Sequence, residues 1–125
     1  MHIRNIAAAA FLSLAGSATA SVVEVTWTEG NDFQHAAEIE AGGFTEVCGE
    51  LAADERVSWA FEADAELDFN LHYHEGDAVT YPVKSPHARS LADKFTAPLD
   101  QTYCWMWTNR LDTPAMLKVV LSREP

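Results

Sequence analysis

Two histidines separated by one residue, His72 and His74, have the spacing in this chain that is best suited to chemistry. In an extended strand alternate side chains point to the same side, so both imidazoles lie on one face, with their backbones roughly 6.5–7 Å apart. Asp68 and Asn70 share this face, which therefore gathers four polar groups in a row. Two imidazoles in such positions can converge on one ion, and imidazole suits copper, zinc or nickel.

A metal site would need at least one further ligand, and the sequence leaves its identity open. Besides Asp68 and Asn70, the candidates are Glu75, His87, His35 and, for cuprous copper, Met106 or Met116. No HxxxH or CxxC cluster accompanies the pair. The alternative interpretation is that His72 and His74 lie on an exposed or interface face and make ordinary hydrogen bonds. The spacing alone does not decide between the two.

Aromatic residues form a second candidate site. Tyr103, Trp105 and Trp107 alternate on one predicted strand, and Trp59 and Tyr73 belong to two other predicted strands. Such side chains can form a platform for a sugar or another flat ligand, to which Asp68 and Asn70 would add polar contacts. The same residues also suit the core of a small sandwich.

Catalytic motifs are not found in the sequence. Acidic pairs such as Asp64 with Glu66, or Asp68 with Glu75, can serve as acid and base, but nineteen acidic residues make surface charge the simpler explanation. No GxSxG serine, glycine-rich phosphate loop or basic groove occurs. We therefore predict a non-enzymatic protein without a cofactor, unless copper or another transition metal binds.

The first twenty residues predict a secretory signal. His2 and Arg4 make a short basic start, an apolar run follows from Ile6 to about Ala15, and Ala18-Thr19-Ala20 supplies the small residues of a cleavage site. We expect a signal peptide at 1–20, a single domain at 21–125, and a periplasmic or secreted protein. No later stretch approaches the roughly 20 apolar residues of a membrane-spanning helix, so no membrane insertion is expected.

The charge of the chain limits its partners. After residue 20 it carries seven basic and nineteen acidic residues, a formal net charge of −12. Such a surface repels the phosphates of nucleic acids and anionic lipids. We therefore predict an unknown protein or small ligand as the partner, and no nucleic acid.

Both cysteines, Cys48 and Cys104, lie in the part expected to be exported, where an oxidising compartment favours a disulfide. The bridge would close a loop of about 57 residues, for which chain entropy predicts roughly 4 kcal/mol of stabilisation. The wide spacing, without a CxxC motif, argues against redox catalysis. We predict a structural Cys48–Cys104 bridge.

Period-two alternation predicts strands along most of the chain. Arg56–Ala63 and Glu66–Glu75 are two of them, and we expect a turn at 63–65 to join them. Glu75-Gly76-Asp77 is suited to a hairpin, whose second strand would end at Pro82 because proline cannot donate to a ladder. Further strands are predicted at 21–28, 44–51, 101–109 and 116–123, and residues 33–41 fit either a helix or a strand.

One segment has helical spacing. Ser85 is a possible cap, Pro86 suits a first helical position, and apolar residues recur from Ala88 to Phe95, which predicts a short helix around residues 86–95. Seven or eight short strands with this possible helix, and no βαβ pattern, predict an all-β fold, an antiparallel β-sandwich.

Several motifs follow one another along the chain: a strand cysteine (Cys48), a VSWAF strand, an LDFNLHYH strand with a glycine-containing hairpin, and an aromatic strand that carries a second cysteine and ends in Asn109. Their order resembles that of the GOLD domain, the β-sandwich of luminal Golgi cargo receptors and some exported bacterial proteins. The resemblance covers roughly Ile39 to Arg123. It has one departure: the eukaryotic pattern places the second cysteine at the position of Met106, whereas here it is Cys104.

The GOLD resemblance implies a non-enzymatic binding or interaction fold and names no ligand. Our leading prediction from the sequence is therefore an exported binding or interaction module. The alternative is a periplasmic metal-binding protein of the copper type that uses His72 and His74.

Overall fold

The structure is a computed structural model that describes residues 20–125; the predicted signal peptide lies, up to residue 19, outside the described residues. Within this range all the regular secondary structure is strand, and the prediction of an all-β fold with seven or eight strands is confirmed. The strands are β1 (Ala20–Glu24), β2 (Asp32–Ile39), β3 (Phe44–Leu51), β4 (Arg56–Glu75), β5 (Ala78–Thr96), β6 (Gln101–Thr108) and β7 (Ala115–Arg123). The ambiguous segment 33–41 is thus mostly strand.

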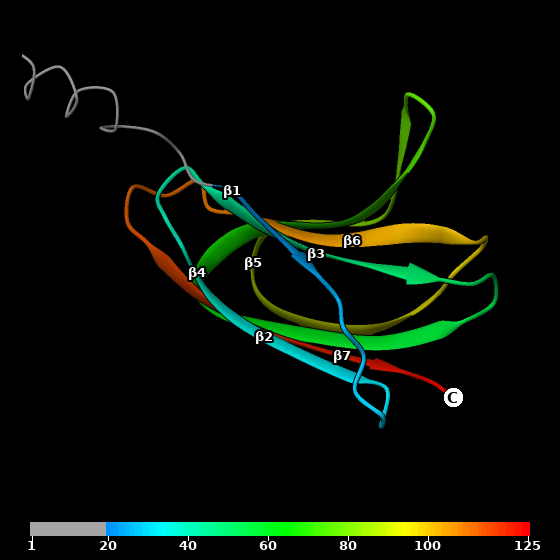
Figure 1. The fold of residues 1–125 in the computed structure, drawn as a ribbon. Helices are drawn as coiled ribbons and strands as arrows, with labels where there is room; N and C mark the ends of the chain where they lie inside the picture. The colour runs from blue at the N-terminus through cyan, green and yellow to red at the C-terminus, as the bar shows by residue number, and fades with distance from the viewer. Residues whose placement is uncertain (1–19) are drawn as a thin grey trace, which may run out of the picture.

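The seven strands form one curled sheet, in which hydrogen-bonded neighbours follow the order β1-β3-β6-β4-β7-β2 and β5 pairs with β4. One edge of β4 pairs with β7 over residues 57–63 and with β6 over residues 68–72. The sheet therefore folds over at β4 into an upper layer with β1, β3 and β6 and a lower layer with β2 and β7 (Figure 1). The pair β1–β3 is parallel and all other pairs are antiparallel, so the sandwich is built from a mixed sheet.

The core lies between the two layers, where alternate side chains of each strand meet. Phe69 is at its centre, with its ring 5.0 Å from the rings of both Trp59 and Phe61 and 5.4 Å from Trp107. Tilted and edge-on aromatic contacts at such distances add to the stabilisation from burying apolar area. Leu67 and Leu71, the neighbours of Phe69 on the same face, are fully buried.

The turn predicted at residues 63–65 is not present. β4 is one continuous strand of 20 residues, which bends where its pairing with β5 shifts register between Glu62 and Leu67. A bulge of this kind bends a strand without breaking it. The bend carries β4 from the lower layer to the upper one, so a single strand replaces the two that the sequence predicted.

The helix predicted around residues 86–95 is wrong, because β5 runs as a strand through the whole segment. Its apolar residues Ala88, Leu91 and Phe95 pair with Leu67, Phe61 and Val57 of β4. Ala88 and Leu91 are three residues apart, so in a regular strand their side chains would point to opposite faces. The register shift between Glu62 and Leu67 places both on the same face. Apolar residues at intervals of three and four therefore look helical although the backbone is extended.

The prediction that the second strand of the hairpin ends at Pro82 is also wrong. β5 pairs with β4 alone, so its other edge has no partner strand among the described residues, and the pairing shifts register between Leu71 and Tyr73, where Pro82 has no partner in the ladder. Edge strands and bulges are the places where a sheet tolerates proline. The hairpin itself is confirmed: Glu75 pairs with Ala78 across a two-residue turn.

Gly76 is the first residue of this turn and has a φ of 61°, a conformation that glycine adopts without steric cost. The tip of the β4–β5 hairpin projects beyond the upper layer (Figure 1). Across residues 20–125, no helix is long and apolar enough to span a membrane.

Candidate metal centre on the upper layer

The outer side of the upper layer brings six functional side chains from three strands together. We call this set the upper face: Glu46, Cys48, Asn70, His72, Cys104 and Met106. These side chains form two rows across the layer, each made of residues that are paired in register on β3, β6 and β4. In the first row Met106 of β6 is paired in register with Glu46 of β3 on one side and with Asn70 of β4 on the other.

The second row contains the disulfide. Cys48 and Cys104 lie directly opposite each other in the β3–β6 ladder, with 4.1 Å between their Cα atoms, and form the predicted bridge. Met106, at the position of the second cysteine in the eukaryotic GOLD pattern, lies opposite Glu46 instead. On its other side Cys104 pairs with His72, so the histidine is next to the bridge.

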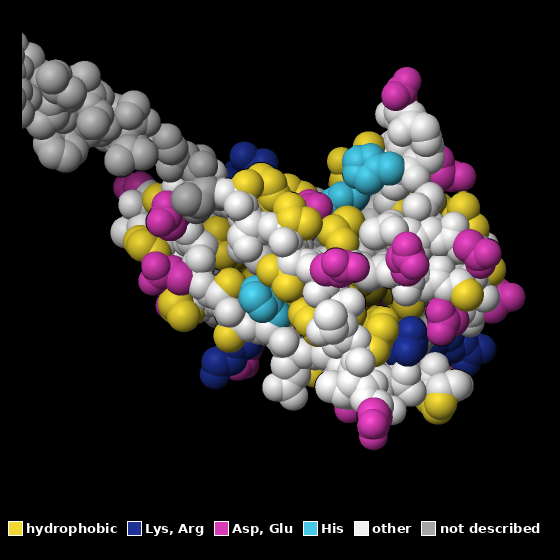
Figure 2. All heavy atoms as spheres, viewed as in Figure 1, with side chains coloured by type: hydrophobic (Ala, Val, Ile, Leu, Met, Phe, Trp, Pro, Cys, Tyr) yellow, Lys and Arg dark blue, Asp and Glu magenta, His cyan; other side chains and the backbone are white. Residues whose placement is uncertain are grey.

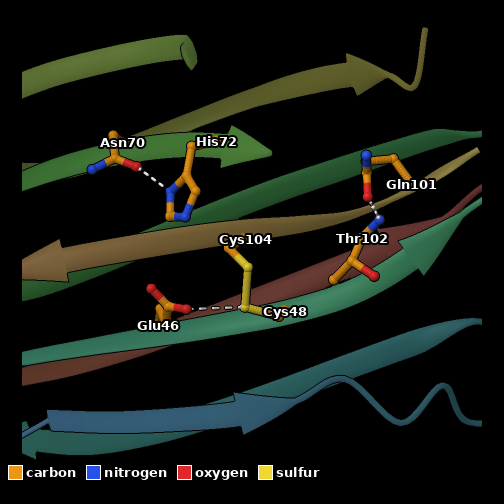
Figure 3. Close-up of a disulfide and its surroundings, with 7 residues drawn as sticks. All are labelled: Glu46, Cys48, Asn70, His72, Gln101, Thr102 and Cys104. Atoms are coloured by element: carbon orange, nitrogen blue, oxygen red, sulfur yellow. Dashed lines mark hydrogen bonds between the residues drawn. A yellow bond between two sulfur atoms is a disulfide. The ribbon is translucent and has the colours of Figure 1, made fainter. Parts of the chain in front are cut away.

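His72 is only 6% exposed, although it is on the outer side of the sheet. Its Nδ1 lies 2.7 Å from Asn70 Oδ1, and because the amide oxygen is an acceptor, Nδ1 carries the hydrogen and donates it. Nε2 is then the nitrogen with the lone pair. Figure 3 shows this second nitrogen directed toward the disulfide. Asn70 thus fixes both the ring orientation and the tautomer, as hydrogen-bonded neighbours of metal-binding histidines do.

The pKa of His72 lies below its ordinary value. Burial has the largest effect and lowers this pKa, because the charged imidazolium loses hydration. The Glu46 carboxylate raises the pKa and His74 lowers it again. His72 is therefore neutral at neutral pH, which is the form that binds a metal ion.

Glu46 is the residue at this site that the sequence analysis missed. Its carboxylate, the His72 ring and Cys104 Sγ offer ligand atoms that all lie within 4.8 Å of one another. Cys104 is disulfide-bonded and has no thiolate to offer, so Glu46 and His72 are the effective donors. Glu46 Oε1 also lies 3.4 Å from Cys48 Sγ (Figure 3), a contact rather than a hydrogen bond, because a disulfide sulfur carries no hydrogen.

His74 is close to His72, as the HxH spacing predicts. The two ring centroids are 5.3 Å apart and the rings are nearly perpendicular, at 85°. Tyr81 of β5 has its ring centroid 5.8 Å from that of His72, and Lys84 Nζ lies 4.3 Å from the Tyr81 ring centroid. Figure 2 shows histidine side chains at the foot of the projecting hairpin. Of the two histidines, His72 is buried and held in orientation by Asn70, and His74 is exposed.

The other candidate ligands are distributed over the molecule. Met106 lies next to Glu46 and Asn70, so its thioether belongs to the site. Glu75 is exposed at the end of β4, beside the hairpin turn. His35 and Met116 belong to β2 and β7 of the lower layer, away from His72.

His87 and Asp68 form a separate arrangement. The backbone N–H of His87 donates to Asp68 Oδ1 at 3.2 Å, and Arg110 Nε donates to Asp68 Oδ2. Burial raises the pKa of Asp68, but the hydrogen bonds and charges of Arg110 and His87 together lower this pKa by more, so it lies below its ordinary value. Asp68 is thus an ionised member of a surface ion pair.

Trp105 and Trp107 lie in the core, with exposed fractions of 1% and 0%. Trp59, Tyr73 and Tyr103 are buried as well. The tyrosine hydroxyl of Tyr103 is held inside by donating to the Leu99 carbonyl at 2.6 Å. With their ring faces covered by protein, these side chains build the sandwich and offer no platform to a ligand.

Neither a protein-family model nor a curated protein sequence matches the chain. Solved structures do. PliG of Aeromonas hydrophila, a periplasmic inhibitor of g-type lysozyme, superimposes with a TM-score of 0.70 at 9% identity, over 86% of this chain and 100% of PliG. The fold is similar to that of PliG.

Two further structures share this architecture. CorA of Methylomicrobium album BG8, a surface-associated copper-binding protein, has a TM-score of 0.59 at 9% identity, over 85% of this chain and 100% of CorA. The pre-peptidase C-terminal domain of a Bacillus anthracis collagenase has a TM-score of 0.59 at 12% identity, over 86% of this chain and 97% of that domain. At these identities the likeness is one of fold.

Proposed function

We propose that this protein is an exported, non-enzymatic binding protein whose ligand is a copper ion, held by His72 and His74 with Glu46 as third donor. The observation that carries the proposal is the state of His72. Its ring is buried, its Nδ1 hydrogen is donated to Asn70, its lowered pKa leaves Nε2 unprotonated, and the ring offers a nitrogen within 4.8 Å of a Glu46 carboxylate oxygen.

The affinity order of the first-row ions favours copper for this donor set. Two imidazole nitrogens and a carboxylate oxygen also occur at zinc sites, but Cu²⁺ binds such ligands most tightly in the first-row series. Met106, next to Glu46 in register, adds a soft thioether that suits the cuprous state. His74 is exposed, so its ring can rotate to meet an ion bound at His72.

Other observations support the proposals that the protein is exported and that it is a binding protein. The N-terminal signal pattern and the Cys48–Cys104 bridge suit an oxidising compartment. The fold is shared with an inhibitor, PliG, and with a copper-binding protein, CorA. The motif order that resembles the GOLD domain points the same way, toward a binding fold without catalytic machinery.

The test is a Cu²⁺ titration of the purified mature protein with the disulfide intact. Tight binding with nitrogen hyperfine structure in the EPR spectrum is expected, and His72→Ala with His74→Ala is expected to weaken affinity by about 100-fold or more, since both imidazoles are lost. His35→Ala, a histidine of the lower layer, is the matched control and is expected to bind as the natural protein does. Equal affinity in the double variant and the natural protein would refute the copper site.

A second candidate function is the binding of a cationic protein. The upper layer and the hairpin expose Val22 (65%), Val79 (38%) and Tyr81 (42%), and the chain is strongly acidic. Exposed apolar side chains on a chain with a large net negative charge suit a basic partner protein. The fold is also that of the g-type lysozyme inhibitor PliG.

A g-type lysozyme is therefore the first partner to test. Calorimetric titration is expected to give binding that weakens with salt, and Tyr81→Ala with Val79→Ala is expected to lower the affinity. Val120→Ala, an equally exposed valine (44%) of the lower layer, is the control. Absence of both binding and inhibition would remove g-type lysozyme as the partner.

A further inference from the structure

We infer that reduction of the Cys48–Cys104 disulfide converts the upper face into a second, thiolate-containing site for Zn²⁺, with Cys48, Cys104, His72 and Glu46 as ligands. The inference shares His72 and Glu46 with the proposed copper site and does not use His74. Their failures are distinguishable, because only the copper site uses His74 and only the zinc site requires the reduced cysteines.

The ligand atoms are already gathered. Glu46, His72 and Cys104 offer atoms within 4.8 Å of one another, Cys48 Sγ is bonded to Cys104 Sγ, and Glu46 Oε1 is 3.4 Å from Cys48 Sγ. Zinc bonds of about 2.0–2.3 Å at tetrahedral angles separate ligand atoms by about 3.3–3.8 Å. The sulfurs must move apart, and donors at the 4.8 Å limit must move inward by about 1 Å, a shift of the size that side-chain rotation gives.

The sheet keeps the two cysteines together after the bridge opens. They face each other in a β3–β6 ladder of eight residue pairs from Phe44–Thr108 to Leu51–Gln101, and β6 is also paired with β4 on its other edge. Two antiparallel strands with seven other pairs hold the cysteines opposite each other without the covalent bond. The site thus needs no rearrangement of the backbone.

The chemistry balances as two steps. A dithiol reductant cleaves the bridge, so Cys48 and Cys104 each gain one electron and one proton while the reductant becomes a disulfide. Zn²⁺ then displaces the two thiol protons and binds two thiolates, the His72 Nε2 lone pair and the Glu46 carboxylate, a closed set that suits a tetrahedral d¹⁰ ion. Zn²⁺ is the probe because Cu²⁺ would reoxidise the thiols.

The experiment compares oxidised and reduced protein with Zn²⁺, and with Cd²⁺ as the spectroscopic probe. Reduction is expected to raise Zn²⁺ affinity by about 100-fold or more and to give thiolate-to-Cd²⁺ charge-transfer absorption. His72→Ala in the reduced protein is expected to reverse about tenfold or more of that gain, because one of four ligands is lost. His74→Ala is expected to retain the gain while weakening Cu²⁺ binding to the oxidised protein.

The His72 variant distinguishes a folded site from a pair of cysteines in an unfolded chain, which would bind zinc equally with or without His72. Near-UV circular dichroism follows the buried tryptophans through reduction. The inference is overturned if reduction leaves Zn²⁺ affinity unchanged, if His72→Ala has no effect, or if the reduced chain loses its near-UV signal and zinc does not restore it.

Discussion

The two outer sides of the sandwich have the same alternation but contrasting chemistry. On the lower layer the outward residues of β4 and β7 form three directly opposed pairs, which we call the lower face: Ser58–Ser122, Ala60–Val120 and Glu62–Lys118. Each polar group there meets a like or complementary one. On the upper face Glu46 is opposite Met106, and Asn70 and His72 are opposite Met106 and Cys104.

The difference shows what distinguishes a solvated face from a site. Glu62 has Lys118 directly opposite it in the ladder, and a cross-strand neighbour of opposite charge stabilises a carboxylate. Glu46 has a thioether opposite it and a neutral, buried imidazole nearby. A carboxylate among neutral donors leaves a negative charge that a bound cation can balance.

Removing the disulfide is expected to have the largest effect on stability. Cys48→Ser with Cys104→Ser releases a loop of about 57 residues in the unfolded chain and should lower the free energy of unfolding by roughly 4 kcal/mol. The matched pair on the lower face, Ser58→Ala with Ser122→Ala, should change it by less than about 0.5 kcal/mol. Urea unfolding measures both, and similar losses in the two would contradict a special role for the upper face.

Asn70→Ala tests the orientation of His72. Without the Oδ1 acceptor the imidazole loses its fixed tautomer, and the Cu²⁺ affinity of the oxidised protein should fall by about 10–100-fold. Glu62→Ala, on the same strand but on the lower face, should leave the affinity unchanged. Titration of both variants at one pH makes the comparison, and an unaltered affinity in Asn70→Ala would show that His72 needs no second residue to orient it.

The titration of His72 should make stability depend on pH. Its folded pKa is below the ordinary value of 6.5, so below that pH the unfolded chain binds a proton that the folded chain does not. The free energy of unfolding then falls with falling pH, by at most about 1.4 kcal/mol per pH unit until the folded pKa is reached. His72→Phe should remove this part of the dependence. Unfolding curves from about pH 5 to pH 8 measure the free energy of unfolding of both proteins. The same pH dependence in His72→Phe and in the natural protein would refute the prediction.

Local patterns in the sequence predicted those parts of the fold that depend on local alternation. The strands of Val57–Phe61 and Trp105–Trp107, the glycine turn at Gly76 and the disulfide follow from neighbouring residues and residue type. The bend in β4 does not, because a bulge between Glu62 and Leu67 shifts the register and makes the apolar spacing of β5 look helical. Such shifts depend on which strands pair.

The candidate site was half predictable for the same reason. His72, His74 and Asn70 share one strand, so alternation places them together. Glu46 comes from β3, and its closeness to His72 depends on the β3–β6–β4 register. Glu46 lies two residues before Cys48, so alternation places both on the same face of β3. Only the pairing of Cys104 with His72 shows that this face of β3 is continuous with the face of β4 that carries His72.

The smallest expected effect concerns Asp68, which borders the upper face without belonging to it. Asp68 pairs with Arg110, whose side chain is 72% exposed, so Arg110→Ala should cost no more than about 1 kcal/mol. Because the pKa of Asp68 is lowered in the folded state, this contribution is present above its ordinary value of 3.8 and is lost as the pH falls through the folded pKa. Salt should weaken it as well, since the pair is exposed to solvent. A loss of copper affinity in Arg110→Ala would instead extend the site to Asp68 and change the boundary between the ion pair and the metal centre.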